Sequence, residues 1–130
     1  MIQLDPHRND EGVIAYTGCD CSLSYALAAI EGKWKLPVLF VLCMNGSLRY
    51  NALKRALGVT NMMLTSTLKE LEAYGLVSRR QYNEIPPRVE YTATELALEL
   101  RPTLEAFGSW GDKVRAYRQA TENEGDEHTA

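Results

Sequence analysis

A short turn between two amphipathic segments constrains the fold of this chain more than any other feature. Residues 50–57 have the apolar spacing of a short helix. Residues 58–60 follow as a turn, in which Gly58 can adopt a positive φ. Thr60 then caps a second predicted helix over 61–74. The inward stripe of this second helix consists of Leu64, Leu68 and Leu71. Two helices joined in this way form a helix-turn-helix.

Further elements are predicted on both sides of this motif. The apolar residues of 22–31 recur at helical spacing, and 33–43 is apolar almost all round, which predicts a helix at the buried centre of the domain. Residues 47–49 have the pattern of a short strand. Residues 76–83 and 88–92 alternate like strands, and the Pro-Pro pair between them predicts a hairpin with a stiff tip. The hairpin makes the motif a winged helix-turn-helix.

The C-terminal part is predicted as one long helix. Thr94 is a candidate N-cap, apolar residues recur every three or four positions up to Arg118, and Pro102 should kink the helix against the carbonyl of Leu98. The fold class is therefore mainly α with a small β-hairpin, that is, α+β. The expected parts are an N-terminal arm (1–18), a winged helix-turn-helix domain (19–118) and an acidic flexible tail (119–130).

The formal net charge of -3 conceals a cationic middle segment. Residues 33–88 carry nine Lys and Arg and three acidic residues, whereas 1–32 and 89–130 are both net acidic. A cationic face on an otherwise acidic protein suits a polyanion such as DNA. Random clustering of solvated side chains gives the same distribution, so charge alone leaves both interpretations open.

Length and composition exclude several classes of protein. A chain of 130 residues with 45% hydrophobic and 24% charged residues fits one globular domain. The longest apolar run, 36–44, is too short to cross a bilayer, and the first residues lack the layout of a secretory signal. We therefore expect no membrane and a cytoplasmic location. The common catalytic and nucleotide-binding motifs do not occur, so no enzyme activity, metal or cofactor is expected.

The helix predicted over 61–74 is the candidate recognition helix. Opposite its leucine stripe, it presents side chains that suit base edges in the major groove. These candidate base contacts are Asn61, Met62, Thr65, Ser66 and Lys69. The candidate phosphate contacts are Arg49, Lys54, Arg55, Arg80 and Arg88. Arg79 and Arg80 point to opposite faces of a strand, so only one is expected to reach DNA. For each residue, including Lys33 and Lys35, an ordinary solvated surface is the alternative.

The three cysteines fall into two groups. Cys19 and Cys21 come immediately before the first predicted helix, whose dipole lowers the pKa of a nearby thiol, although Asp20 opposes this effect. Cys43 lies within the apolar helix and is predicted as part of the core.

Four segments together resemble the HxlR family of bacterial and archaeal winged-helix transcription regulators, which are relatives of the MarR-type regulators. These segments are GKWKLP, LRYNALKRAL, MLTSTLKELE and IPPRVEYT. The resemblance implies a homodimer that binds a palindromic operator in double-stranded DNA. It also implies that the N- and C-terminal helices form the dimer contacts, which here are Leu23, Leu27, Leu100, Leu104, Phe107, Trp110 and Val114.

The resemblance also suggests an effector. Some family members sense oxidants or electrophiles through a cysteine just before the first helix, and Cys21 matches that position. Ser22 stands where the family usually has Pro, which changes the setting of this cysteine. Met62 stands where the family usually has Lys or Arg, which removes a cationic contact and predicts a different operator.

Two other functions remain open on the sequence alone. A winged helix can serve as a protein-interaction module without DNA, and binding that does not depend on salt would favour this role. A regulator that responds to a small ligand, without cysteine sensing, would need a pocket lined by aromatic residues such as Trp34, Tyr50, Phe107 and Trp110.

Overall fold

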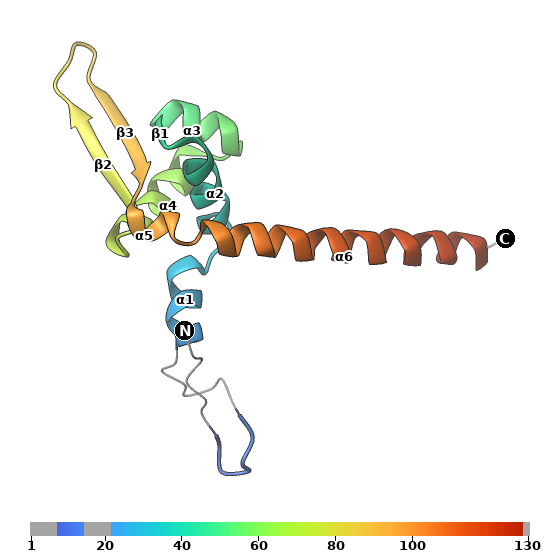
Figure 1. The fold of residues 1–130 in the computed structure, drawn as a ribbon. Helices are drawn as coiled ribbons and strands as arrows, with labels where there is room; N and C mark the ends of the chain where they lie inside the picture. The colour runs from blue at the N-terminus through green and yellow to red at the C-terminus, as the bar shows by residue number, and fades with distance from the viewer. Residues whose placement is uncertain (1–7, 15–21, 129–130) are drawn as a thin grey trace.

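The computed structural model describes residues 8–14 and 22–128 (Figure 1). Within these ranges the chain forms a small helical domain with one antiparallel sheet, and a long C-terminal helix runs away from it. The elements are α1 (Ser22–Ile30), α2 (Lys35–Asn45), β1 (Ser47–Arg49), α3 (Tyr50–Leu57), α4 (Asn61–Ala73), β2 (Val77–Tyr82), β3 (Arg88–Ala93), α5 (Glu95–Leu98) and α6 (Arg101–His128). The mainly α architecture with a small β-hairpin is confirmed.

The helix-turn-helix consists of α3 and α4. Gly58 ends α3 in the left-handed conformation with φ 67°, and its N–H donates to the carbonyl of Lys54. The side chain of Thr60 accepts a hydrogen bond from the backbone N–H of Met63 at 3.2 Å, so it caps α4 as the sequence predicts. The glycine and the threonine therefore set the angle between the two helices.

The sheet has the strand order β1-β3-β2, and both pairs are antiparallel. The short strand at 47–49 and the hairpin are confirmed. The register pairs Arg79 with Tyr91 and Arg80 with Glu90. Since neighbouring residues of a strand face opposite sides, Arg79 and Arg80 point in opposite directions, as predicted. Figure 1 shows that the turn of the hairpin extends beyond the helices as a wing.

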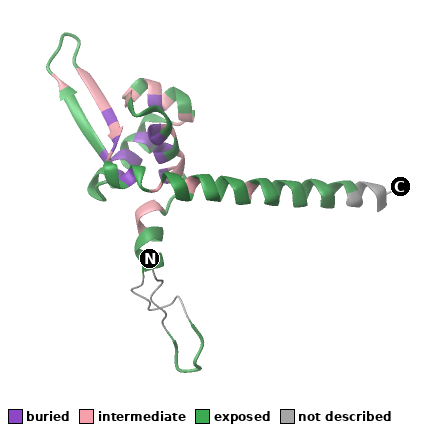
Figure 2. Ribbon diagram, viewed as in Figure 1, coloured by how far each residue is buried: buried purple, intermediate pink, exposed green. Residues whose placement is uncertain are grey.

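The core lies where α2, α3 and α4 meet the sheet. Val38, Leu39 and Leu42 of α2 are completely buried, which confirms this helix as the centre of the domain. Its other side is less buried than the sequence predicts, because Phe40 and Met44 are each 55% exposed. The stripe of α4 is buried as predicted, by Leu64, Leu68 and Leu71. Figure 2 shows the buried residues concentrated in this part of the molecule.

The prediction of a single C-terminal helix beginning after Thr94 is wrong. Thr94 does cap a helix, through a 3.3 Å hydrogen bond from the N–H of Ala97, but α5 ends at Leu98 and α6 begins at Arg101. Pro102 explains the break, because its ring conflicts with the carbonyl of Leu98 and its nitrogen carries no proton to donate there. In the first turn of α6 the same proline is tolerated.

The two ends of the chain also differ from the expected forms. The N-terminal arm is expected to be extended, but residues 8–14 form a tight turn in which Arg8 and Ile14 pair as a β-bridge. The acidic tail begins at residue 119, yet α6 continues as a helix to His128. The division of the chain into arm, domain and tail stays a prediction. No helix of the described ranges is both long and apolar enough to cross a membrane.

Candidate nucleic-acid interface

The outer face of α4 brings together the five residues predicted to contact bases. Asn61, Met62, Thr65, Ser66 and Lys69 are all exposed, and together they line one shallow depression on the surface. Met62 is 81% exposed, which is a large value for an apolar side chain. Because the leucines on the opposite side of α4 are buried, these five side chains face outward.

A tyrosine that the sequence analysis did not assign to this face holds its N-terminal end. The hydroxyl of Tyr50 donates to the backbone carbonyl of Asn61 at 3.1 Å and lies 3.0 Å from the hydroxyl oxygen of Thr65. Tyrosine has one hydroxyl proton, so Thr65 is the donor in the second bond. The Tyr50 ring packs on Tyr91 at a centroid distance of 6.4 Å. Tyr50 therefore links the sheet and α3 to two candidate base contacts.

The cations around α3 are available to an anionic partner. Arg49 and Arg55 are exposed and Lys54 is half-buried. Within the described part of the chain, none of the three makes an ion pair. Arg49 directly precedes the first turn of α3, which contains no acidic residue. A positive helix N-terminus and unpaired guanidinium groups suit phosphate oxygens.

The remaining cations have different surroundings. Arg80 is exposed on the wing, and its guanidinium lies 4.8 Å from the Tyr82 ring centroid. Arg88 is half-buried and forms ion pairs, which distinguishes it from the other candidate phosphate contacts. Lys35 is buried and pairs with Glu70 at 3.2 Å, so the solvated-end interpretation is wrong for it, whereas Lys33 is exposed.

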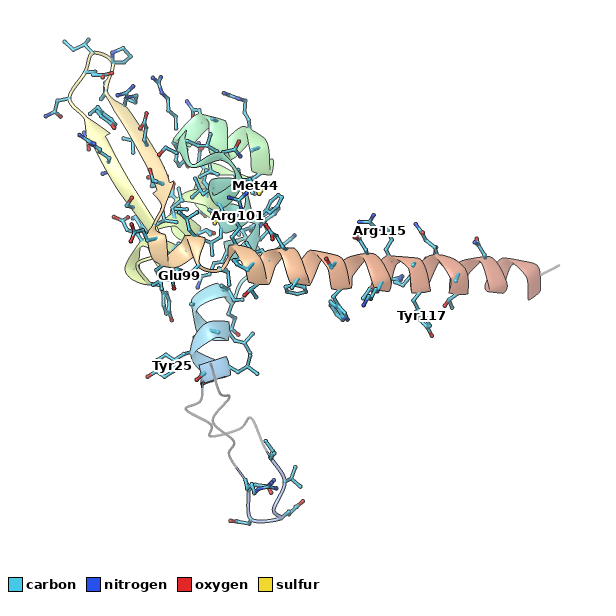
Figure 3. The ribbon with its side chains drawn as sticks, viewed as in Figure 1. Tyr25, Met44, Glu99, Arg101, Arg115 and Tyr117 are labelled. Carbon is cyan, nitrogen blue, oxygen red and sulfur yellow. The ribbon has the colours of Figure 1, made fainter. Side chains whose placement is uncertain are left out.

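A second surface joins α1 and α6. Leu23 and Leu27 of α1, and Phe107, Trp110 and Val114 of α6, are exposed apolar residues, while Leu100 and Leu104 are half-buried. A largely apolar groove of about 510 Å³ lies between α1, the start of α2 and α6, and it is lined by Leu27, Ile30, Glu31, Leu36 and Phe107. Figure 3 shows Tyr117 and Arg115 projecting from opposite sides of α6. We call the five exposed residues the α1–α6 surface.

The alternative of a small-ligand receptor needs an aromatic pocket, but two of the residues named for it do not line the same cavity. Tyr50 lines a cavity beside the wing, whereas Phe107 lines the groove against α1. These two aromatic residues therefore belong to separate cavities.

Of the three cysteines, only Cys43 lies within the described residues. Cys43 is buried, its thiol donates to the carbonyl of Ala97 at 3.7 Å, and burial raises its pKa against a smaller opposing effect of Arg101. Its prediction as a core residue is confirmed. Cys19 and Cys21 lie outside the described residues. The described residues contain no group of three or more His, Cys, Asp or Glu placed to hold a metal ion.

The sequence and the structure of the chain are similar to those of known proteins. The sequence profile of the HxlR-like helix-turn-helix proteins matches residues 29–119. An uncharacterized HTH-type transcriptional regulator of Methanothermobacter thermautotrophicus is 41% identical over 123 residues, which cover 88% of this chain and 91% of the relative. The HTH-type transcriptional regulator YkvN of Bacillus subtilis is 49% identical over 92 residues, which cover 70% and 77%. The reduced form of the redox regulator HypR superimposes with a TM-score of 0.68 at 35% identity, over 75% of this chain and 97% of HypR.

Proposed function

The chain belongs to the HxlR-like helix-turn-helix family, and we propose that it is a homodimeric transcription regulator that binds a palindromic DNA operator. The observation that carries the proposal is the outer face of α4, which is exposed, mixed polar and apolar, and flanked by unpaired cations. Its relatives bear the names of HTH-type transcriptional regulators, and two of them match 70% and 88% of the chain. Operator binding implies the cytoplasm as the location.

In this proposal α4 enters the major groove. Asn61 is suited to adenine, Ser66 and Thr65 to either base class, and Met62 to the methyl group of thymine. The Tyr50 hydroxyl also lies 3.4 Å from Oδ1 of Asn61 and contacts the Thr65 hydroxyl, so it orients both side chains before DNA arrives and less side-chain entropy is lost on binding. Arg49, Lys54, Arg55 and Arg80 contact phosphates. These contacts set the register of the helix in the groove, and the α4 side chains select the sequence.

The α1–α6 surface supports the homodimer. Large exposed apolar side chains gathered on two adjoining helices are typical of a protein-protein contact. Phe107 and Trp110 remain 51% and 59% exposed within the protomer, and their ring centroids lie 5.8 Å apart. A second copy that covers the same surface would place two α4 helices in successive major grooves, about 34 Å apart.

The first experiment measures binding of the reduced protein to its own upstream intergenic DNA by fluorescence anisotropy, with a scrambled duplex as the reference. We expect tight binding to the native duplex alone and a steep loss of affinity as salt rises. Lys69→Ala should weaken binding, whereas Lys113→Ala on exposed α6 should not. An absence of binding at low salt would contradict the proposal and favour a winged-helix protein-interaction module.

We further propose that Cys21 makes the regulator responsive to oxidants. The support is its position directly before Ser22, the first residue of α1, together with the likeness to HypR, a named redox regulator. Cys43 is a poor alternative because its thiol is buried and burial raises its pKa. Treatment with diamide should change the DNA affinity of the wild type but not that of Cys21→Ser. An equal response of the two proteins would refute this role, and the Cys19→Ser variant tests the neighbouring thiol.

A further inference from the structure

A buried lysine joins α2 to the candidate recognition helix α4. Lys35 is only 8% exposed, and its ammonium group lies 3.2 Å from a carboxylate oxygen of Glu70. The same ammonium lies 5.4 Å from the ring centroid of Tyr74, the residue at the C-terminal end of α4. The turn between α1 and α2 lies close to the aliphatic stem, since a Cβ at Gly32 would meet Cγ and Cδ of Lys35 at 3.9 Å. Lys35 therefore lies at a junction of three segments of the chain.

The position of this lysine makes it a poor source of stability. Lys35 is the first residue of α2, where the positive end of the helix dipole opposes a cation. Burial also removes water from its charge, and buried ion pairs commonly do no more than offset that cost. An apolar side chain of similar size, such as methionine, would fill the same space. What the charged pair adds to the apolar packing of α4 is a contact with a defined direction.

Two polar contacts hold α4 from opposite sides. The leucine stripe on its inner side packs without directional preference, so it defines the rotation of the helix about its axis only weakly. At 100° per residue, Thr65 lies about 90° to one side of this stripe and Glu70 about 130° to the other. Tyr50 contacts Thr65 near the N-terminal end of α4, and Lys35 contacts Glu70 near the C-terminal end. The two contacts together define which side chains α4 turns outward.

We propose that Lys35 is a positioning residue for α4, and that it fixes the rotation of this helix through Glu70 without contacting DNA. This inference rests on the proposed function. Glu70 lies next to Lys69 and one helical turn from Ser66, so these are the two candidate base contacts that it aligns. A small rotation of α4 displaces their side chains from the base edges. The pair therefore affects the selection of sequence more than the binding of phosphates.

The first test replaces Lys35 with methionine, which removes the ammonium group and keeps an unbranched apolar stem. Lys33→Met is the matched control, because it removes the same charge from an exposed side chain that forms no ion pair within the described residues. Lys35→Met should weaken binding to the native duplex about tenfold, close to the loss of one base contact. On the scrambled duplex the two variants should bind alike, and the urea midpoint of Lys35→Met should equal that of the wild type.

Two outcomes of this test would overturn the positioning role. If Lys35→Met and Lys33→Met bind the native duplex alike, the ammonium group does not orient α4. If Lys35→Met loses more affinity than Lys33→Met, but equally for both duplexes, the lysine does not act on sequence selection. The urea midpoint then distinguishes a loss of folding from a lost phosphate contact.

A double-mutant cycle tests whether Lys35 acts through Glu70. Glu70→Gln alone should weaken binding to the native duplex, whereas Glu72→Gln, at an exposed position of the same helix, should not. The double variant Lys35→Met/Glu70→Gln has the net charge of the wild type. Its affinity should nevertheless match that of Lys35→Met, because the two residues act as one unit. Either a return to wild-type affinity or a full sum of the two losses would overturn the proposal.

The base preferences of the operator give a readout that a loss of stability would not produce. Each base pair of the native duplex is replaced in turn, and the Ser66→Ala and Asn61→Ala variants identify the positions that these two side chains read. Lys35→Met should reduce the preference at the Ser66 positions more than at the Asn61 positions, because Tyr50 still holds Asn61. An equal reduction at both sets of positions would contradict a rotation of α4 controlled from its C-terminal end.

The outcomes distinguish this inference from the proposed function. If Lys69→Ala weakens operator binding while Lys35→Met behaves like Lys33→Met, the positioning role is refuted and the regulator stands. If the wild type fails to discriminate the native from the scrambled duplex, both are overturned.

Discussion

Replacing Gly111 with alanine adds one methyl group to α6 and tests whether this helix makes a close contact in the proposed dimer. Glycine within a helix lowers its stability by about 1 kcal/mol relative to alanine, yet α6 contains Gly108, Gly111 and Gly125. A Cβ built at Gly111 meets no atom within 4 Å. Packing within the protomer therefore does not require glycine at this position, and alanine should stabilise an isolated α6.

The opposite result is expected in the homodimer. Gly111 lies one turn from Phe107 and Val114, on the same side of α6, where a second copy would approach. A methyl group added to a close helix contact costs about 1–3 kcal/mol, and a two-fold axis repeats the change in both copies. The dimer dissociation constant should therefore rise by at least about tenfold, while the helix content of the dissociated chain rises.

Sedimentation velocity over a dilution series, combined with circular dichroism, measures both effects. Ser109→Ala is the control, because residue 109 lies about 200° around the helix from Gly111 and should raise helicity without changing dissociation. If Gly111→Ala leaves the dissociation constant unchanged or lowers it, α6 does not make the close contact argued above.

Three further predictions concern interactions within the protomer. Tyr50→Phe removes the three hydroxyl contacts to α4 and should weaken operator binding about fivefold, whereas Tyr74→Phe should not, as anisotropy would show. Glu70→Gln should lower the free energy of unfolding by about 1 kcal/mol because it leaves the buried Lys35 charge unpaired, while Lys35→Met should be nearly neutral in urea denaturation. Burial raises the pKa of the Cys43 thiol, so the unfolded chain ionises first; stability should fall as the pH rises above the ordinary thiol pKa of about 8.5, and Cys43→Ala should lose that part of the pH dependence.

Local patterns were sufficient for the elements whose signals lie close together in the sequence. The boundaries of α3 and the start of α4 follow from Gly58 and Thr60, and the inward stripe of α4 follows from three leucines at helical spacing. Once that stripe is buried, the outward position of Lys69 and its neighbours is a consequence of the helical period alone.

Contacts between distant residues could not be predicted in this way. Tyr50 reaches Thr65 across the helix-turn-helix, and Lys35 reaches Glu70 only because α2 packs against α4. The contacts of Arg88 depend on the strand register, which places it opposite Tyr82. Sequence patterns alone suggest solvent for Lys35, a ligand pocket for Tyr50 and DNA for Arg88. Only the tertiary packing shows which polar groups already have a partner.

The exposed length of α6 relates the proposed dimer contact at the α1–α6 surface to the proposed DNA contact on the outer face of α4. Side chains along this helix are exposed up to residue 123, apart from half-buried Leu104 and Gly111, so its outer turns gain little from packing on their own domain. A helix stabilised mainly by tertiary contacts needs such a surface to be covered. In the proposed dimer the partner covers it, and the same contact fixes the separation of the two α4 helices. In this proposal, a change at the junction of α1 and α6, including modification of the cysteine that precedes α1, would act on DNA affinity through that separation rather than through the α4 side chains.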